Sequence, residues 1–257
     1  MKPLTKIAFN TLIASTIPII VSLLLMIVAP SHPGYAAGEQ MVGVKVPPSL
    51  FKGLLLFNIE HRFYGPVEGD IVDNYFGIDD GANIDLSLGY IPMDKTQIDI
   101  HRVRNEKEYV VNVARTFYNG KRWKVALGAS YFNYKPILAS SRSQGLMPYA
   151  VVQTPKLWDT QPYINLAYDG YFQSVGAGLG LDISVKDDLS VILEAYTSNQ
   201  KRGKYAATLI GLRYKTFGHQ FTVMLENTPE IGLRRLMTGS TNNSYSLGFS
   251  VNRVLDL

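Results

Sequence analysis

The chain has 257 residues, with 25 Lys and Arg, 21 Asp and Glu, and no Cys. The lack of Cys excludes disulfides, Cys-ligated metals and a thiol nucleophile, and the net charge of +4 comes without the basic stripe expected of a nucleic-acid partner. Charged residues make up 18% of the sequence, against about 25% in an ordinary soluble domain. Low charge together with 16 Tyr and 22 Gly indicates that the polar side of this fold is not an ordinary solvated surface.

The first 36 residues differ from the rest. Lys2 and Lys6 precede an apolar stretch from Ile7 to Pro30, and Gly34-Tyr35-Ala36 follows. A basic start, an apolar centre and a small-x-small exit are typical of an export signal. We expect a signal peptide over 1–36, cleaved after Ala36 with Ala37 as the second choice. The alternative is a retained membrane anchor, because the apolar stretch is long enough to span a bilayer.

Removal of the signal peptide lowers the net charge from +4 to +2. Residues 37–52 are predicted to be a loose periplasmic lead-in, and residues 53–257 to form a single domain.

That domain alternates with a period of two. From Ala82 to Tyr90, the even positions are apolar or aromatic and the odd positions are polar or Gly. From Ser174 to Ser184, aliphatic residues alternate with Gly, Ser and Asp. Successive side chains of a strand point to opposite faces, so each segment has one apolar and one polar face.

Turn residues divide the alternating segments. Asn119-Gly120 and Asp169-Gly170 are signals for two-residue hairpins. Residues 147–154 are the weakest segment, but without them the short turns would no longer share one rim. We therefore predict twelve strands, near 53–63, 82–91, 96–103, 108–118, 121–132, 147–154, 162–168, 171–184, 188–197, 204–216, 219–227 and 243–253. Ten strands are the alternative count.

The apolar faces are predicted to point outward. The polar faces are rich in Gly, Ser and Asn, whereas a solvated outer face would use Lys and Glu heavily. The apolar rows have the length of a tilted membrane-spanning strand, and aromatic residues gather near their ends, as at a lipid–water interface. Together with the export signal, this predicts an all-β fold: a transmembrane antiparallel up-and-down β-barrel in the bacterial outer membrane, reached through the periplasm.

Several motifs resemble an uncharacterised family of predicted bacterial outer-membrane β-barrel proteins. The family's usual opening block combines His-Arg-Phe, Phe-Gly-Leu-Asp and Gly-Tyr. The resemblance covers roughly residues 50–253 and implies fold and location, with no activity to carry over. The matching stretches are His61-Arg62-Phe63-Tyr64-Gly65, Phe76-Gly77-Ile78-Asp79-Asp80-Gly81, Leu88-Gly89-Tyr90 and Gly176–Glu194.

Ionisable residues on the polar faces are the candidate site, because charges at membrane depth must pair or meet water. A turn centred on Met93 would place Asp85 opposite His101 and Ser87 opposite Asp99. Such a pair is either a selectivity or proton-sensitive element, or a structural pair inside a plugged barrel. The candidate lumen-lining residues are Glu60, Arg62, Asp85, Asp99, His101, Lys124, Asp182, Glu194, Arg213 and Glu226.

The height of these charges is predicted to differ along the barrel. Glu60, Glu194 and Glu226 should lie nearer the outer rim, whereas Lys124, Arg213 and Lys215 should lie nearer the inner rim. Such a gradient could bias the passage of ions. The basic loop residues Lys201, Arg202, Lys204, Arg234 and Arg235 are expected to be solvated, with contact to anionic lipid headgroups as the alternative.

Other chemistry has little support. A Ser nucleophile needs a base such as His beside it, and no His has a Ser two residues away on the same strand face. No catalytic residue is therefore assigned. A Ser and a His on different strands would still permit a lipid-modifying enzyme. Gly176-x-Gly178-x-Gly180 lies inside a predicted strand, and its spacing differs from that of a nucleotide-binding loop. We expect these glycines to leave room on the lumen face of the wall. No metal-ligand spacing occurs, and we expect no metal or other cofactor.

Two functions remain open besides that enzyme. The first is a narrow passive channel for small solutes; the second is a plugged structural or docking barrel, which Arg62, Phe172, Tyr196 and Tyr205 would favour if they closed the lumen. The expected partners are outer-membrane lipids, lipopolysaccharide, the barrel-assembly machinery and a small solute, with no nucleic acid. The sequence does not indicate an oligomeric state.

Overall fold

The computed structural model describes residues 40–68, 74–200, 202–216 and 218–256. The predicted signal peptide, and the membrane anchor that is its alternative, lie outside these residues. No helix within the described ranges is long and apolar enough to cross a membrane. The strands are β1 (Leu54–Pro66), β2 (Ala82–Met93), β3 (Thr96–Val103), β4 (Glu108–Asn119), β5 (Lys124–Tyr134), β6 (Ser143–Gln153), β7 (Thr160–Asp169), β8 (Ser174–Ser184), β9 (Leu189–Ser198), β10 (Ala207–Thr216), β11 (His219–Glu226) and β12 (Ser246–Asp256).

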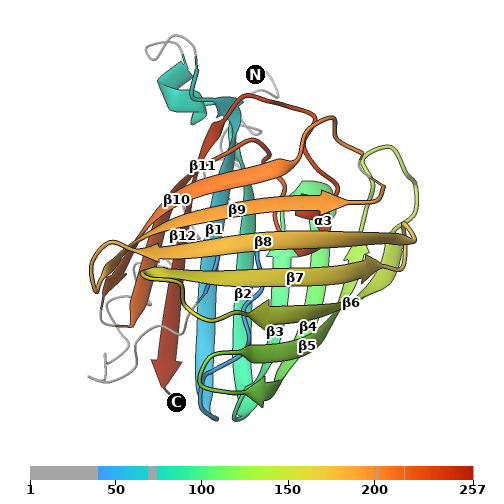
Figure 1. Ribbon diagram of the computed structural model, residues 1–257. Coiled ribbons are helices and arrows are strands. Elements are labelled where there is room, and N and C mark those ends of the chain that lie inside the picture. The colour runs from blue at the N-terminus through green and yellow to red at the C-terminus, as the bar shows by residue number, and fades with distance from the viewer. Residues whose placement is uncertain (1–39, 69–73, 201, 217, 257) are drawn as a thin grey trace. The chain divides into compact units, whose positions relative to one another are not determined.

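The strands form one closed antiparallel barrel (Figure 1). Each strand pairs with its neighbours in sequence, and β12 returns to pair with β1 from Leu54↔Asp256 onward. The predicted twelve strands are confirmed, and β6 occupies the weakest of the predicted segments. Three short helical elements lie between strands: η1 (Tyr75–Gly77), η2 (Asn105–Lys107) and α3 (Leu233–Met237).

The apolar face of the wall points outward, as predicted. On β8, Val175 and Leu179 are exposed, whereas Gly176, Gly178 and Asp182 are buried inside the barrel. The same alternation runs along the other strands and leaves many large apolar side chains on the outer surface. Closure pairs the backbone groups of every strand, which is what hydrocarbon surroundings require.

The two rims differ in their connections. One rim, here called the short-turn rim, carries the carboxyl end of β12 and short connections such as residues 94–95 and 185–188. The opposite rim, the long-loop rim, carries residues 67–68, 74–81 and 227–245. This asymmetry is typical of outer-membrane barrels and was expected from the turn signals.

Two turns are longer than their sequence predicts. Asn119 pairs with Lys124, and Asp169 pairs with Ser174, so each connection has four residues instead of two. In the second, the Asp169 carboxylate accepts hydrogen bonds from the backbone N–H groups of Tyr171, at 2.8 Å, and Phe172, at 3.1 Å. This side-chain cap stabilises an open turn, which competes with the tight turn that an Asp-Gly pair favours.

Candidate functional site

Residues 40–52, here called the inserted segment, run from inside the lumen to the short-turn rim, where Phe51 and Lys52 are exposed. The Lys45 N–H donates to Asn165 Oδ1 at 2.6 Å, and Asn165 Nδ2 donates to the Lys45 carbonyl at 2.8 Å. Nearer the short-turn rim, Thr116 Oγ1 donates to the Pro48 carbonyl at 2.7 Å. The sequence predicts a loose lead-in over this part of the chain. The structure instead satisfies its backbone with inward-facing side chains of the wall.

The Glu194 carboxylate holds the deepest part of the inserted segment. It accepts hydrogen bonds from the Val42 N–H at 2.7 Å and the Gly43 N–H at 2.9 Å, and from the Tyr196 hydroxyl. The backbone is so close to its surroundings at Gly43 that an added Cβ would lie 2.3 Å from Leu236 Cδ1 and 2.5 Å from the Tyr196 oxygen. Only glycine fits at this position without displacing its neighbours.

Glu194→Gln should loosen the inserted segment. Hydrogen bonds to a charged acceptor contribute about 1.5 kcal/mol or more, so amide exchange within residues 40–52 should rise about tenfold. Hydrogen–deuterium exchange mass spectrometry of that peptide measures the effect. Asp187→Asn, an exposed change of the same kind on the short-turn rim, is the control. Equal exchange in both variants and the wild type would contradict the role of Glu194.

A second insertion enters from the long-loop rim. Residues 227–245, here called the α3 loop, carry α3, which packs against β8 and β9 (Figure 1). Asn83 Nδ2 donates to the Pro229 carbonyl at 2.8 Å. Leu233 and Leu236 join the buried apolar cluster of the lumen. The two insertions therefore meet at Leu236 and together fill the middle of the barrel.

Two arginines fasten α3 to the wall. Arg234 Nη2 lies 2.6 Å from Glu108 Oε1, and Arg235 Nε lies 2.9 Å from Glu108 Oε2. Arg235 also pairs with Glu106, and Arg234 Nη1 lies 3.8 Å from Asp169 Oδ2. We call this set of ion pairs the latch. The expectation of solvated charge is wrong for Arg234 and Arg235, because their loop folds inward over a ring of carboxylates.

Charge and burial oppose each other in the latch. Burial disfavours the charged form of Arg235, but Glu108, Glu230 and Glu106 outweigh it and raise the pKa of the guanidinium. Burial raises the pKa of the Glu230 carboxyl, and the attraction of Arg235 offsets only part of this effect. Rings complete the surroundings, since Arg234 Cζ lies 4.1 Å from the ring centre of Phe132 and 4.7 Å from that of Tyr134.

The glycine row of β8 makes room for both insertions, as its position inside a strand predicts. A Cβ at Gly176 would lie 2.4 Å from Met237 Sδ of α3. A Cβ at Gly180 would lie 2.8 Å from Met41 Cε of the inserted segment. Of the four side chains proposed as lumen closers, Arg62 and Tyr196 are buried, and Phe172 and Tyr205 are half-buried.

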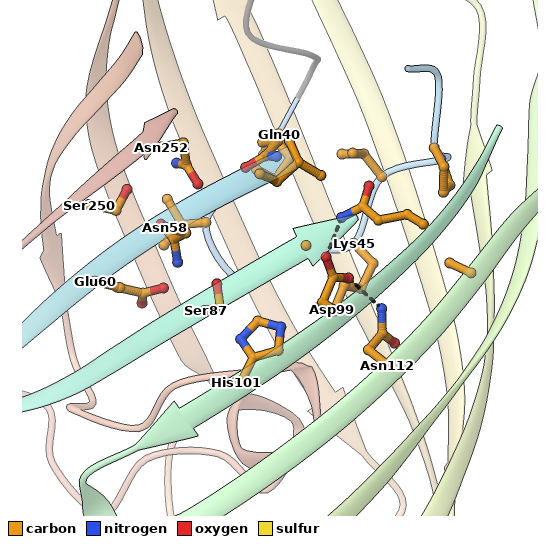
Figure 2. A pocket seen from close by; sticks show the side chains of 18 of the residues that line it. Gln40, Lys45, Asn58, Glu60, Ser87, Asp99, His101, Asn112, Ser250 and Asn252 are labelled. Atoms are coloured by element: carbon orange, nitrogen blue, oxygen red, sulfur yellow. Dashed lines mark hydrogen bonds between the residues drawn. The ribbon is translucent and has the colours of Figure 1, made fainter. Parts of the chain in front are cut away.

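Two neighbouring cavities remain beside the insertions, of about 100 and 80 Å³. The larger lies toward the short-turn rim, between the inserted segment and the inner faces of β1–β4 and β12, as Figure 2 shows. The smaller continues toward the long-loop rim, where Glu108, Arg234 and Arg235 line it. The wall residues Asn58, Glu60 and His101 belong to both, so the cavities follow one another along a polar wall.

Asp85 and His101 meet in this wall, with 2.7 Å between Asp85 Oδ2 and His101 Nδ1. The predicted register, Asp85 opposite His101 and Ser87 opposite Asp99, is wrong by two residues. Ser87 lies opposite His101 and Gly89 opposite Asp99, because the turn begins after Met93 rather than being centred on it. Asp85 reaches His101 diagonally. His101 Nε2 has no hydrogen-bond partner among the described residues.

Glu60, Arg62 and Glu226 form a buried cluster. Arg62 Nε lies 2.5 Å from Glu60 Oε1 and 3.2 Å from Glu226 Oε2, and the Arg62 side chain has no exposed surface. Arg62 Nη1 and Nη2 have no hydrogen-bond partner among the described residues. The cluster is therefore held by charge more than by complete hydrogen bonding.

The remaining candidates are distributed around the wall. Arg213 Nη1 pairs with Asp182 Oδ2 at 2.9 Å, and Asp99 Oδ2 accepts a hydrogen bond from Asn112 Nδ2 at 2.9 Å. Lys124 is half-buried at the beginning of β5. The predicted charge gradient is offset near both rims. Arg62 pairs with Glu60 and Glu226 toward the long-loop rim, and Asp182 pairs with Arg213 toward the short-turn rim.

The ten candidates thus divide into separate pairs and clusters rather than one catalytic centre. No group of three or more His, Asp or Glu with metal-binding geometry occurs in the described ranges.

The sequence matches the family of membrane-bound β-barrel domains, DUF5777, over residues 41–143 and 163–255. The chain belongs to this family. The matched range begins within the inserted segment, so this part of the DUF5777 domain extends beyond the strands of the wall. No curated protein matches the chain by sequence.

Solved structures share the fold of this DUF5777 barrel. The KdgM porin is similar over 78% of this chain and 98% of its own, with 11% identity and a TM-score of 0.52. KdgM in complex with disordered oligogalacturonate covers the same shares at 10% identity and a TM-score of 0.50. Outer membrane phospholipase A from Escherichia coli covers 82% of this chain and 99% of its own, with 11% identity and a TM-score of 0.44.

Sequence reasoning missed the groups of this DUF5777 barrel that hold the insertions, chiefly Asn165, Glu108 and the inserted segment itself. One signal was present in the sequence. Asn165 lies on the inward face of β7, and its side-chain amide can accept a hydrogen bond from a backbone N–H and donate one to a backbone carbonyl. The row of Gly176, Gly178 and Gly180 on the inner face of β8 was another signal, since room on a lumen wall implies something to fill it.

Proposed function

We propose that this protein is a bacterial outer-membrane barrel that provides a narrow route for small solutes, closed at rest by the inserted segment and the α3 loop. The rim asymmetry and the outward apolar bands support the outer-membrane location. The porin fold of KdgM is consistent with the role, although fold alone does not establish function.

The observation that carries the proposal is the polar stretch of wall that the two cavities share, formed by Asn58, Glu60 and His101 on β1 and β3. The inserted segment is hydrogen-bonded to the opposite wall at Asn165 and Glu194, and the α3 loop is held by Glu108 at the end of the smaller cavity. A purely structural plug would be expected to pack against every side of the lumen. Here Asp85 and His101 line the smaller cavity, and Asp85 Oδ1 and His101 Nε2 have no hydrogen-bond partner among the described residues. Movement of the latch would join the cavities to the long-loop rim.

Liposome swelling with neutral sugars and small organic acids tests this route. Release of the latch by Arg234→Ala/Arg235→Ala should let the otherwise closed barrel admit the smallest solutes, and adding Ser87→Phe, which fills the larger cavity, should abolish this swelling. Leu88→Phe is the matched control, because residue 88 is on the same strand but faces outward. Folded wild-type protein that stays impermeable even after release of the latch would favour the plugged docking barrel instead.

A membrane-embedded enzyme is the weaker alternative. It is favoured by the placement of Asp85, His101 and Ser87 on adjoining strands. A nucleophile requires its base within hydrogen-bond reach, and His101 Nε2 makes no such bond to Ser87 or to any other described residue. Hydrolysis of phospholipid or acyl ester vesicles by the purified protein, lost in Ser87→Ala, would support it.

A further inference from the structure

Two adjacent rows of side chains cross the outer wall of β3–β6 near the long-loop rim. The row nearer the middle of the barrel is apolar, and its members are exposed; they are Ile100, Val111, Tyr131 and Leu146. The next row toward the rim is polar and consists of Arg102, Tyr109, Asn133 and Gln144. The change from apolar to cationic within two residues marks the edge of the membrane's hydrocarbon region.

Two guanidinium groups flank Tyr109 in the polar row. Arg102 Cζ lies 4.7 Å from the centre of the Tyr109 ring, and Arg142 Cζ lies 5.6 Å from it. Arg142 Nη2 also donates to the backbone carbonyls of Lys107 and Asn133, each at 2.9 Å. The ring and the loop carbonyls hold both cations at the outer surface.

These cations are not neutralised by acidic side chains. Within the described residues, neither Arg102 nor Arg142 forms an ion pair. Of the acidic residues near Arg102 in sequence, Asp99 is buried beside Asn112. Glu106 and Glu108 pair with the arginines of α3. Lys107 and Lys135 are exposed on the same stretch of rim and add to the positive charge.

We propose that this surface binds a phosphorylated glycolipid of the outer leaflet, with its phosphate held by Arg102 and Arg142 and an acyl chain along the apolar row. Guanidinium groups suit phosphate oxygens because they offer paired donors in a fixed plane. An amphiphile satisfies both rows at once, which free phosphate does not. The inference rests on the proposed outer-membrane location but is independent of solute passage.

Native mass spectrometry in an uncharged maltoside detergent tests the site, with bis-phosphorylated lipid A as the probe. The wild type should retain one lipid, and Arg102→Gln/Arg142→Gln should bind it roughly thirtyfold more weakly, since two cations near the headgroup are removed. Arg102→Lys/Arg142→Lys keeps the charge and should restore most of the binding. Lys121→Gln/Arg122→Gln, which removes two exposed cations from the short-turn rim, should bind like the wild type.

Two further probes identify the source of the anion. Dephosphorylated lipid A with the same acyl chains should bind weakly, and inorganic phosphate should not displace the bis-phosphorylated lipid. Equal binding by the double Gln variant, or displacement by inorganic phosphate alone, would overturn the proposal. Planar-bilayer conductance of the double Gln variant should equal that of the wild type. Lipid binding therefore tests the proposed lipid site, whereas conductance tests the proposed solute route.

Discussion

Replacing Arg234 and Arg235 with alanine should turn a barrel that is closed at rest into one that conducts. The double change removes the contacts of both guanidinium groups with Glu108 and that of Arg235 with Glu106. It also leaves the buried Glu108 without its cations. Loss of about 3 kcal/mol from the closed form would raise the open population about a hundredfold.

Single-channel recording in planar bilayers measures this change as open time, and liposome swelling measures it as solute entry. Arg202→Ala is the matched control, because Arg202 stacks on Phe172 at the same rim, with 3.7 Å from Cζ to the ring centre, but has no part in the latch. Heat-modifiable mobility on gels would establish that each variant is a folded barrel. A double variant that is folded but remains silent would show that movement of α3 does not open a route.

Arg62→Met should cost about 3–5 kcal/mol of the free energy of unfolding, because removing one partner from a buried ion cluster leaves the others uncompensated. Glu60 and Glu226 both lie beside Arg62 Nε and are themselves buried. Glu226, which has no exposed surface and borders neither cavity, could not be hydrated without disturbing the packed lumen. The measurement is urea unfolding of the protein reconstituted in lipid vesicles.

The companion variants separate charge from packing. Arg62→Met combined with Glu60→Gln and Glu226→Gln should recover most of the loss, since no net charge then remains buried. Arg122→Met, at an exposed position, should change stability by less than about 0.5 kcal/mol. If the triple variant is no more stable than Arg62→Met alone, packing by the Arg62 side chain outweighs its charge.

Much of the wall could be predicted because its signal is local. Alternation along β8 or β2 appears within ten residues, and the composition of the polar faces decided that the apolar faces point outward. The turn geometry was less accessible. Residue types do not specify the backbone details that let the Asp169 side chain cap its turn. They also do not specify where the β2–β3 turn begins, and this shifted the pairing of His101 by two residues.

The candidate site could be predicted only in part. Asp85 and His101 were expected to meet and do so, though diagonally rather than directly opposite, because strand neighbours in sequence are neighbours in the barrel. The latch was missed, since Arg234 and Arg235 look like solvated loop charge until the loop is seen to fold inward. Their partner Glu108 lies 126 residues from Arg234 along the chain.

The sequence by itself therefore determined the transmembrane barrel, its twelve strands and the direction of its faces, because each follows from a period of two and from the chemistry of lipid and water. Only the tertiary structure decided what fills the lumen. Val42 finds its partner Glu194 at a separation of 152 residues, and Lys45 finds Asn165 at 120. Contacts at such separations leave no periodic trace in the sequence; they arise once the closed wall brings its inward amides and carboxylates around the backbone of the inserted segment.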